Sequence, residues 1–256
     1  MQVPVIRSLD PRKRIASIFL TPRCDMACRF CASEDGFSEM SYEEAAELLQ
    51  ALKGQVDSVV LGGGEPFLWS HDLEKLAALG TDLGFTVQVC TNGVNLPSGF
   101  ESIPGIHRYI LPLESMDPDL HGRLRVLKKG GHFGLVLDRM RTLAQAGREF
   151  TLSTVVTHHN MAGLTDMANW LREACRTGLK VHAWHLYRFL PVGRGGEANA
   201  RMLEVGREEY LHACRAVKAM GLPFTVYQRT DMQRSSTVEF FWFDQGRLCL
   251  GSEAVQ

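Results

Sequence analysis

Short apolar runs rich in β-branched residues alternate along the chain with longer segments of helical period. This alternation is typical of βα units that build a parallel sheet, and at least six such units are predicted. The runs that predict strands are 15–20, 56–61, 86–90, 108–113, 150–157 and 181–189. The segments that predict helices include 42–53, 72–83, 135–146, a segment around Leu164 to Leu171, and a last one around Tyr210 to Val217.

Several predicted elements carry signals at their ends. Ser41 and Glu44 have the spacing of a capping box, in which each side chain bonds the other's backbone N–H, so a helix is expected to begin at Tyr42. Gly84 follows the second predicted helix and is expected to end it. Beyond the sixth unit, a short strand over 224–228 and a hairpin-like stretch over 238–250 are expected.

The predicted elements fit one α/β domain. The chain has 256 residues, close to the roughly 250–300 residues at which a single hydrophobic core stops growing. No internal repeat, low-complexity tract or proline-rich linker divides it. We expect an N-terminal segment over 1–13, a core over 14–203, and an extension over 204–256 whose helix, strand and hairpin pack on that core.

Unusual residues follow four of the predicted strands. A loop with three cysteines follows the first strand, Gly62-Gly63-Gly64-Glu65-Pro66 follows the second, Thr91-Asn92-Gly93 follows the third, and Glu114 closes the fourth. In parallel βα folds the active site is built at the carboxyl ends of the strands, where the loops leave the sheet. These groups are therefore expected to lie on one rim.

The three cysteines on the first loop are Cys24, Cys28 and Cys31. Thiolates are soft ligands that favour iron-sulfur clusters, zinc or Cu(I), and a structural zinc site usually needs a fourth protein ligand. No paired fourth cysteine is present in the sequence, which disfavours a zinc knuckle. A four-iron four-sulfur cube held by three cysteines leaves one iron without a protein ligand, open to a substrate or cofactor.

These motifs together resemble those of the radical S-adenosylmethionine (SAM) superfamily. The CxxxCxxC spacing with Phe30 before the last cysteine is similar to its signature, and Gly63-Gly64-Glu65-Pro66 to its motif for the amino group of SAM. The resemblance covers about 14–195 and implies a partial (βα)6 TIM-like barrel. It also implies one 4Fe-4S cluster on three cysteines, with the amino and carboxylate groups of SAM on the open iron.

The resemblance further implies an enzyme. In this family the reduced cluster donates one electron to the sulfonium, SAM splits into methionine and a 5'-deoxyadenosyl radical, and the radical removes a substrate hydrogen. An electron donor such as flavodoxin or ferredoxin is expected as a partner.

Positions in the family motifs imply the contacts with SAM. The backbone of Phe30 is expected beside adenine, the Thr91-Asn92 turn near the methionine part, and Glu114 near the ribose hydroxyls. The Ser-x-Asp or Asp-x-Lys pattern common at the fourth strand is absent here. The segment 155–160 resembles a strand-five segment that ends in asparagine, and 190–193 a turn near adenine. The expected SAM contacts are Phe30, Gly63, Gly64, Glu65, Pro66, Thr91, Asn92, Glu114, Asn160 and Leu190.

Two of these assignments have a plain structural alternative. Asn-Gly is a common turn, so Thr91-Asn92-Gly93 fits a turn without a ligand as well. Glu114 could equally cap the turn that follows its strand. The other four cysteines stand alone and fit packing roles, so one cluster is expected.

Composition disfavours two classes of binding partner, nucleic acids and membranes. The 28 basic and 29 acidic residues leave no global positive field for nucleic acid or an anionic membrane surface. The amino terminus lacks the apolar region of a secretory signal, and no apolar run approaches a membrane span. We expect a cytoplasmic protein whose cysteines are reduced.

The substrate is expected to be a small polar molecule, with phosphorylated molecules and nucleotides included, because arginines suit the recognition of phosphate or carboxylate. Lys128 and Lys129 could contribute or form a solvated loop. The carboxyl-terminal layout is similar to that of viperin, which dehydrates a nucleoside triphosphate. An activase that installs a glycyl radical and a non-catalytic iron-sulfur sensor stay open as alternatives. The candidate substrate residues are His158, Tyr187, Arg188, Arg194, Tyr227 and Arg229.

Overall fold

A computed structural model describes residues 9–33 and 36–251 of the chain. The predicted N-terminal segment 1–13 and the extension 204–256 therefore lie partly outside the described residues. The strands are β1 (Ile15–Thr21), β2 (Ser58–Gly63), β3 (Thr86–Cys90), β4 (Arg108–Pro112), β5 (Phe150–Val156), β6 (Val181–Arg188), β7 (Thr225–Arg229), β8 (Val238–Asp244) and β9 (Arg247–Leu250). The α-helices are α1 (Tyr42–Leu52), α2 (Leu73–Asp82), α3 (Pro118–Leu124), α4 (His132–Gln145), α5 (Leu164–Arg176), α6 (Gly193–Gly196), α7 (Ala200–Leu203) and α8 (Arg207–Ala219).

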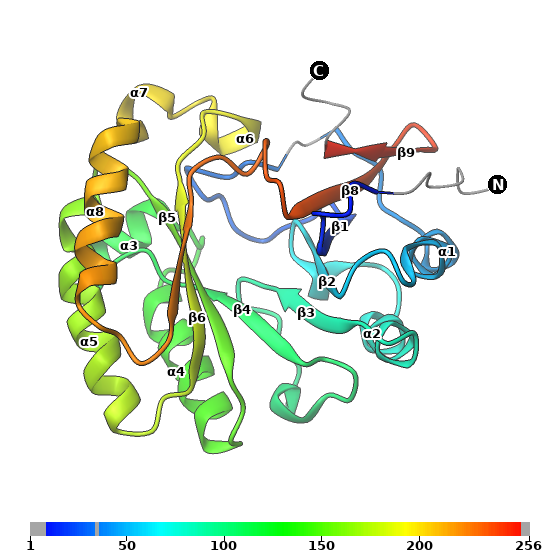
Figure 1. Cartoon of the computed structure of the whole chain (residues 1–256), viewed down its shortest axis with the longest axis horizontal. Coiled ribbons are helices and arrows are strands. Elements are labelled where there is room, and N and C mark those ends of the chain that lie inside the picture. The colour runs from blue at the N-terminus through cyan, green and yellow to red at the C-terminus, as the bar shows by residue number, and fades with distance from the viewer. Residues whose placement is uncertain (1–8, 34–35, 252–256) are drawn as a thin grey trace.

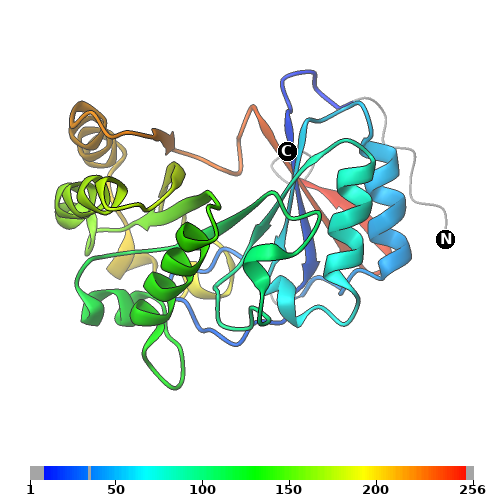
Figure 2. The same cartoon turned by 90° about the horizontal axis from the view of Figure 1, so that it is seen from below.

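The strands form one curved, mostly parallel sheet in the order β7-β6-β5-β4-β3-β2-β1-β8-β9. Only the β8–β9 pair is antiparallel among the described strands. Helices α1 and α2 cover the outer side of one half of the sheet, and α4, α5 and α8 that of the other (Figures 1 and 2). The sheet stays open between β7 and β9, which confirms the prediction of a partial barrel with an α/β architecture.

The carboxyl-terminal elements extend this sheet at both edges. β7 adds to β6, whereas β8 crosses to the far edge and pairs in parallel with β1, with Ile15 opposite Val238. The hairpin predicted over 238–250 is β8–β9. The segment from β7 to β8 crosses between the two edges (Figure 1).

Local sequence accounts for the ends of the elements. Both bonds of the predicted capping box are present: the Ser41 N–H donates to the Glu44 carboxylate at 2.8 Å, and the Glu44 N–H donates to the Ser41 hydroxyl at 3.2 Å. Gly84 follows α2 with a φ of +95°, a conformation that glycine adopts without strain. Three short helices, α3, α6 and α7, were not predicted, because each is too short to show a helical period.

Two buried polar side chains in the core, Tyr210 and Trp184, have hydrogen-bond partners on neighbouring elements. The Tyr210 hydroxyl on α8 donates to the Leu186 carbonyl of β6 at 2.6 Å and accepts from the Arg229 N–H of β7 at 2.8 Å. The Trp184 indole donates to the Thr154 hydroxyl at 2.9 Å. Since an unpaired buried polar group costs about 1–3 kcal/mol, these bonds help to fix how β5, β6, β7 and α8 pack.

Candidate active site

The cysteine loop leaves β1 and lies against two other segments. The Ala27 and Arg29 N–H groups donate to the carbonyls of Val126 and Leu124, both at 2.9 Å. On another side of the loop, the N–H groups of Gly195 and Gly196 in α6 donate to the Cys31 carbonyl at 3.1 and 3.2 Å. The loop is therefore held by backbone bonds on both sides.

Glycines make the second of these contacts possible. A Cβ atom on Gly195 would lie 2.3 Å from the Cys28 carbonyl oxygen, and one on Gly193 would lie 2.4 Å from the carbonyl carbon of Ala32. No side chain fits at such distances, and Gly193 also has a φ of +73°. The sequence interpretation had assigned this region to adenine through Leu190. Gly193 belongs to that predicted turn, whereas Gly195 and Gly196 were missed, although the Gly193-x-Gly195-Gly196 spacing was a visible signal.

Glu65 lies at the carboxyl end of β2, beside the start of the cysteine loop. Its own N–H donates to the Arg23 carbonyl at 2.7 Å, and the Gly64 N–H donates to the Thr21 carbonyl at 2.7 Å. A Cβ on Gly64 would meet the Arg23 carbonyl oxygen at 2.2 Å. The glycine before Glu65 thus allows the β2 turn to lie directly against the loop after β1.

The Glu65 carboxylate is fully buried and accepts three hydrogen bonds. The Thr91 hydroxyl and the Asn92 N–H each donate at 2.7 Å, and the Phe67 N–H donates at 3.2 Å. Burial raises the pKa of Glu65 to about 7, against the opposite effect of these donors. The predicted neighbourhood of Glu65 and the Thr91-Asn92 turn is therefore a direct contact.

Asn92 also reaches the cysteine loop. Its side-chain amide donates to the Asp25 carboxylate at 2.8 Å and lies 3.8 Å from the Cys24 sulfur. Asn95 donates to the second Asp25 oxygen at 2.8 Å. The turn after β3 therefore contacts both Glu65 and the first cysteine.

Glu114 and Asn160 lie at the ends of β4 and β5, and their side chains already have partners. The Glu114 carboxylate is fully buried and accepts from the Arg125 Nε and from the Val155 N–H, both at 2.7 Å. The Asn160 side chain donates to the carbonyls of Glu114 and Val155 and accepts from Thr157. Both residues join neighbouring strand ends, and their expected contacts with SAM stay predictions.

Arg125, which the sequence interpretation did not include, connects Glu114 with the cysteine loop. Its guanidinium lies 3.6 Å from the Cys28 sulfur and 5.1 Å from the centre of the Phe30 ring. Burial raises the pKa of Cys28 to about 11, and the charge of Arg125 acts in the opposite direction. Arg125 was missed because its partners are distant in sequence.

His121 and His132 form a second unpredicted connection, between the ends of β3 and β4. The Glu114 N–H donates to His121 Nδ1 at 3.2 Å, so the proton of this neutral ring is on Nε2, which donates to His132 Nδ1 at 2.8 Å. His132 Nε2 then donates to the Asn92 carbonyl at 2.9 Å. The two buried rings are stacked with centroids 5.1 Å apart.

We expect this pair to give the protein a specific dependence of stability on pH. Burial lowers the pKa of His132 from 6.5 to about 4. Below pH 6.5 the unfolded chain therefore gains a proton that the folded chain does not, and stability is lost as the pH falls toward 4. In His132→Gln, the free energy of unfolding should fall less steeply between pH 6 and 4.5, by about 1.4 kcal/mol per pH unit.

Urea unfolding of the iron-free protein, followed by tryptophan fluorescence at several pH values, measures this slope. The variant His159→Gln, which changes an exposed histidine, is the control. Equal slopes in the wild type and His132→Gln would show that His132 gains its proton equally in both states.

The candidate substrate residues divide into two sets. Tyr187, Tyr227 and Arg229 lie together on β6 and β7. Arg188 follows Tyr187 on β6, so its side chain faces the opposite side of the sheet. Its Nε donates to the Thr230 carbonyl at 3.0 Å. Arg194 donates to the Pro22 carbonyl at 3.1 Å, and His158 is exposed with its N–H bonded to the Leu203 carbonyl. These three residues do not join the first set.

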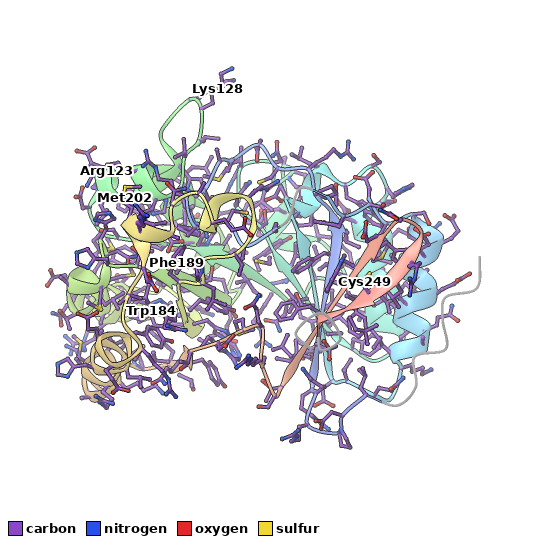
Figure 3. All side chains as sticks on the ribbon, turned by 90° about the horizontal axis from the view of Figure 1, so that it is seen from above. Arg123, Lys128, Trp184, Phe189, Met202 and Cys249 are labelled. Atoms are coloured by element: carbon purple, nitrogen blue, oxygen red, sulfur yellow. The ribbon has the colours of Figure 1, made fainter. Side chains whose placement is uncertain are left out.

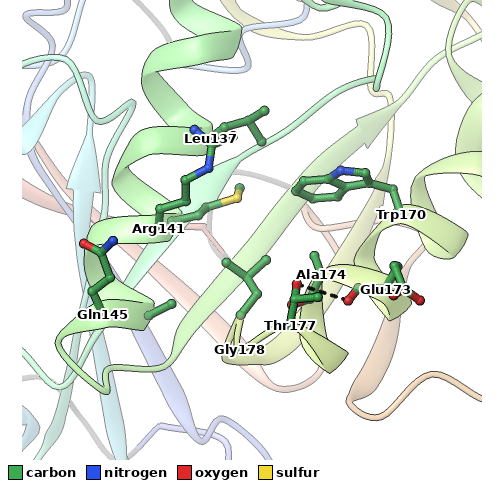
Figure 4. Close-up of a pocket in the computed structure, with 11 residues that line it drawn as sticks. Leu137, Arg141, Gln145, Trp170, Glu173, Ala174, Thr177 and Gly178 are labelled. Carbon is green, nitrogen blue, oxygen red and sulfur yellow. Dashed lines mark hydrogen bonds between the residues drawn. The ribbon is translucent and has the colours of Figure 1, made fainter.

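Two further features are the Lys128 loop, which begins beside the cysteine loop at Val126 and Leu127, and a groove on the outer surface. Lys128 is at the tip of a loop that projects from the body of the protein (Figure 3). A groove of about 530 Å³ is lined by residues of α4 and α5, among them Leu137, Arg141 and Trp170, on the outer surface of the sheet (Figure 4). It extends to the carboxyl end of α5, opposite the carboxyl ends of the strands, and holds none of the candidate residues.

The thiols have the right donor chemistry for an iron-sulfur cluster. All three are free, partly exposed, and carried by one loop. Within the described residues, no three His, Cys, Asp or Glu side chains are arranged to hold a single metal ion. A four-iron four-sulfur cube does not require three side chains to converge on one ion, because each thiolate binds its own iron. The residues present therefore fit the cluster that the motif implies.

Comparison with known proteins establishes the family. The model of the radical SAM superfamily matches residues 18–171, and the chain belongs to this family of enzymes, which use an iron-sulfur cluster and SAM. The chain is 27% identical over 210 residues to the AdoMet-dependent heme synthase of Oleidesulfovibrio alaskensis, a match that covers 78% of this chain and 51% of the relative. It is 35% identical over 143 residues to a probable GTP 3',8-cyclase of Methanocella arvoryzae, covering 53% of this chain and 45% of that protein.

A solved structure shows the same fold. Streptococcus suis SuiB bound to S-adenosylmethionine superimposes with a TM-score of 0.68 at 14% identity, over 89% of this chain and 58% of SuiB. The chain spans about half the length of the curated relatives it matches. In the described part of the chain, none of the helices has the length and apolar character that crossing a membrane requires.

Proposed function

We propose that this protein binds SAM at a single 4Fe-4S cluster held by Cys24, Cys28 and Cys31, and that it cleaves SAM reductively to abstract hydrogen from a small polar substrate. The observation that carries this proposal is the buried carboxylate of Glu65. It is fixed by three donors between the cysteine loop and the Thr91-Asn92 turn. A buried carboxylate at the edge of a thiol site suits the ammonium group of a bound amino acid.

A cluster held by Cys24, Cys28 and Cys31 would supply, when reduced, the one electron that splits the SAM sulfonium into methionine and a 5'-deoxyadenosyl radical, and abstraction of a substrate hydrogen atom would then give 5'-deoxyadenosine. The protein's own residues bind and orient. Glu65 would accept hydrogen bonds from the SAM ammonium, whose charge favours the ionised carboxylate that burial disfavours. Flavodoxin or ferredoxin is the class of electron donor we propose.

The names of the relatives refer to chemistry on non-protein molecules, one of which, GTP, is small and polar. One relative is named for heme synthesis and the other for cyclisation of GTP. Neither substrate is carried over to this chain, which shares about half of each relative. The proposal therefore extends to hydrogen abstraction from a small polar molecule, including a phosphorylated one.

Anaerobic reconstitution with iron and sulfide, reduction with dithionite, and chromatography for 5'-deoxyadenosine test this function. The reduced protein with SAM should form 5'-deoxyadenosine. A reconstituted and reduced protein that forms none would favour a cluster with a sensing or structural role. Stimulation by a glycyl-radical protein instead of small molecules would point to an activase.

Glu65→Gln should retain the cluster and bind SAM about 10- to 100-fold more weakly, since a hydrogen bond to a charged group contributes about 1.5–3 kcal/mol. Glu65 accepts from three donors, and a glutamine would place its NH2 group against at least one of them. Because the NH2 group is itself a donor, that hydrogen bond would be lost. Anaerobic equilibrium dialysis with labelled SAM measures the affinity. Glu197→Gln, at an exposed acid just after α6, is the matched control, and equal affinities in the two variants would remove Glu65 from the SAM site.

A further inference from the structure

A group of polar side chains lies on the inner face of the sheet, apart from the rim residues. Tyr109 on β4 and Trp184 and Leu186 on β6 pack in the hydrophobic core. Because side chains alternate along a strand, the residues between and beside them face the other side. This inner-face cluster consists of Arg108 on β4, His185 and Tyr187 on β6, and Tyr227 and Arg229 on β7.

Strand register brings the β6 and β7 members of the inner-face cluster into contact. Arg108 is the first residue of β4 and lies toward the amino ends of the strands, where Tyr227 influences its pKa. His185 is opposite Tyr227, and Tyr187 is opposite Arg229. The rings of His185 and Tyr227 are 4.9 Å apart, and the His185 Nδ1 and the Tyr187 hydroxyl are 3.2 Å apart. The guanidinium of Arg229 lies 5.1 Å from the centre of the Tyr227 ring. The cluster therefore presents a cation against an aromatic surface.

Both arginines of the cluster have an unused donor. Within the described residues, the Nε atoms of Arg108 and Arg229 are buried and have no hydrogen-bond partner. A donor left unpaired away from water is unfavourable, and one on a charged group more so. An anion on this face would pair these donors.

The surrounding charges are mostly positive or neutral. Glu149, half-exposed and 3.3 Å from His182, is the acid whose charge acts on Arg108. Burial, with the charge of Arg229 next, lowers the pKa of His185 to about 3, so this ring is neutral near pH 7. Burial raises the pKa of Tyr187, which keeps its hydroxyl protonated as a donor. The cluster thus has two fixed cations and a phenol donor.

The inner-face cluster lies next to the rim residues. Tyr187 is opposite Val155 on β5, and the Val155 N–H donates to the Glu114 carboxylate at 2.7 Å. Arg229 is the last residue of β7, at the same carboxyl ends of the strands as the cysteine loop. A molecule on the inner face would therefore approach the proposed SAM site.

We propose that the inner-face cluster binds the substrate through its carboxylate or phosphate groups, with Arg229 as a cationic donor beside Tyr187 and Tyr227, and Arg108 as a second cationic donor toward the amino ends of the strands. That the bound molecule is the substrate rests on the proposed function. Arginine suits both kinds of anion because its planar fork offers two parallel donors. Arg108 is the member of this site that sequence interpretation missed.

Calorimetric titration of the reconstituted, SAM-saturated protein with inorganic pyrophosphate and with tricarballylate tests the site. These probes represent phosphate and carboxylate, and saturating SAM prevents their binding in its place. We expect at least one probe to bind, and to bind at least tenfold more weakly to Arg108→Gln and Arg229→Gln. Arg141→Gln on the outer groove is the matched control, and Arg229→Lys should recover part of the affinity, because it restores the charge but not the two parallel donors of arginine.

Binding of neither probe, or equal affinity in the wild type and both glutamine variants, would overturn the proposal. A preference for one probe identifies the anion. Formation of 5'-deoxyadenosine from SAM alone separates this test from that of the proposed function. The Arg141→Gln protein should form it as the wild type does, whereas a wild type that binds the probes without forming it would contradict only the reductive cleavage.

Discussion

Cys28→Ala is expected to abolish the visible absorbance of the reconstituted cluster and all formation of 5'-deoxyadenosine. A cube held by two thiolates lacks one covalent ligand, and Arg125, whose Nη1 lies 3.6 Å from the Cys28 sulfur, has only donors and cannot replace it. Iron content, the absorption spectrum, and the paramagnetic signal after dithionite measure the loss. The effect should be close to complete, because every later step depends on the cluster.

Cys90→Ala is the matched control, since Cys90 is also a free thiol and interacts electrostatically with Arg125 and Glu65. That variant should keep the iron and the spectrum of the wild type. A Cys28→Ala protein that retains full iron content would contradict the ligand assignment. Loss of the cluster in Cys90→Ala as well would show that the site contains a ligand beyond the three motif cysteines.

The features that sequence predicted well depend on local or strongly periodic information. The capping box of α1 joins residues three apart, so its spacing alone specifies the bonds between Ser41 and Glu44. The rim position of Glu65 followed from a parallel sheet, in which all strands end on one side. Contact between Glu65 and the Thr91-Asn92 turn then needed only that β2 and β3 be neighbours.

The features that sequence did not predict depend on pairings between distant segments. β8 lies beside β1 although more than 200 residues separate Ile15 from Val238, and no local pattern fixes that register. Arg125 reaches Cys28 only because the chain after α3 returns along the cysteine loop, bonded at Ala27 and Arg29. The alternation of β4 could have placed Arg108 on the inner face, but nothing in the sequence told that face from the helix-covered one.

Arg125→Met is expected to lower the free energy of unfolding by about 3–5 kcal/mol, because removing one partner of a buried ion pair leaves an uncompensated charge. Glu114 is fully buried, and its carboxylate has Arg125 and the Val155 N–H as partners in the structure. Burial raises the pKa of Glu114, and the charge of Arg125 is the largest opposing influence. Methionine keeps much of the side-chain volume, so the loss should report the charge and its hydrogen bonds.

A second substitution distinguishes this cause from a simple packing defect. Glu114→Gln removes the buried charge and keeps an oxygen for the Val155 N–H, so the double variant with Arg125→Met should be more stable than Arg125→Met alone. Arg123→Met, at an exposed position two residues away, controls for the loss of an arginine from this segment. Urea unfolding of the four proteins completes the cycle. If the changes in the free energy of unfolding of the two single variants sum to that of the double variant, the Glu114–Arg125 ion pair is not what stabilises this region. Arg125 would then act chiefly through its contacts with Phe30 and Cys28.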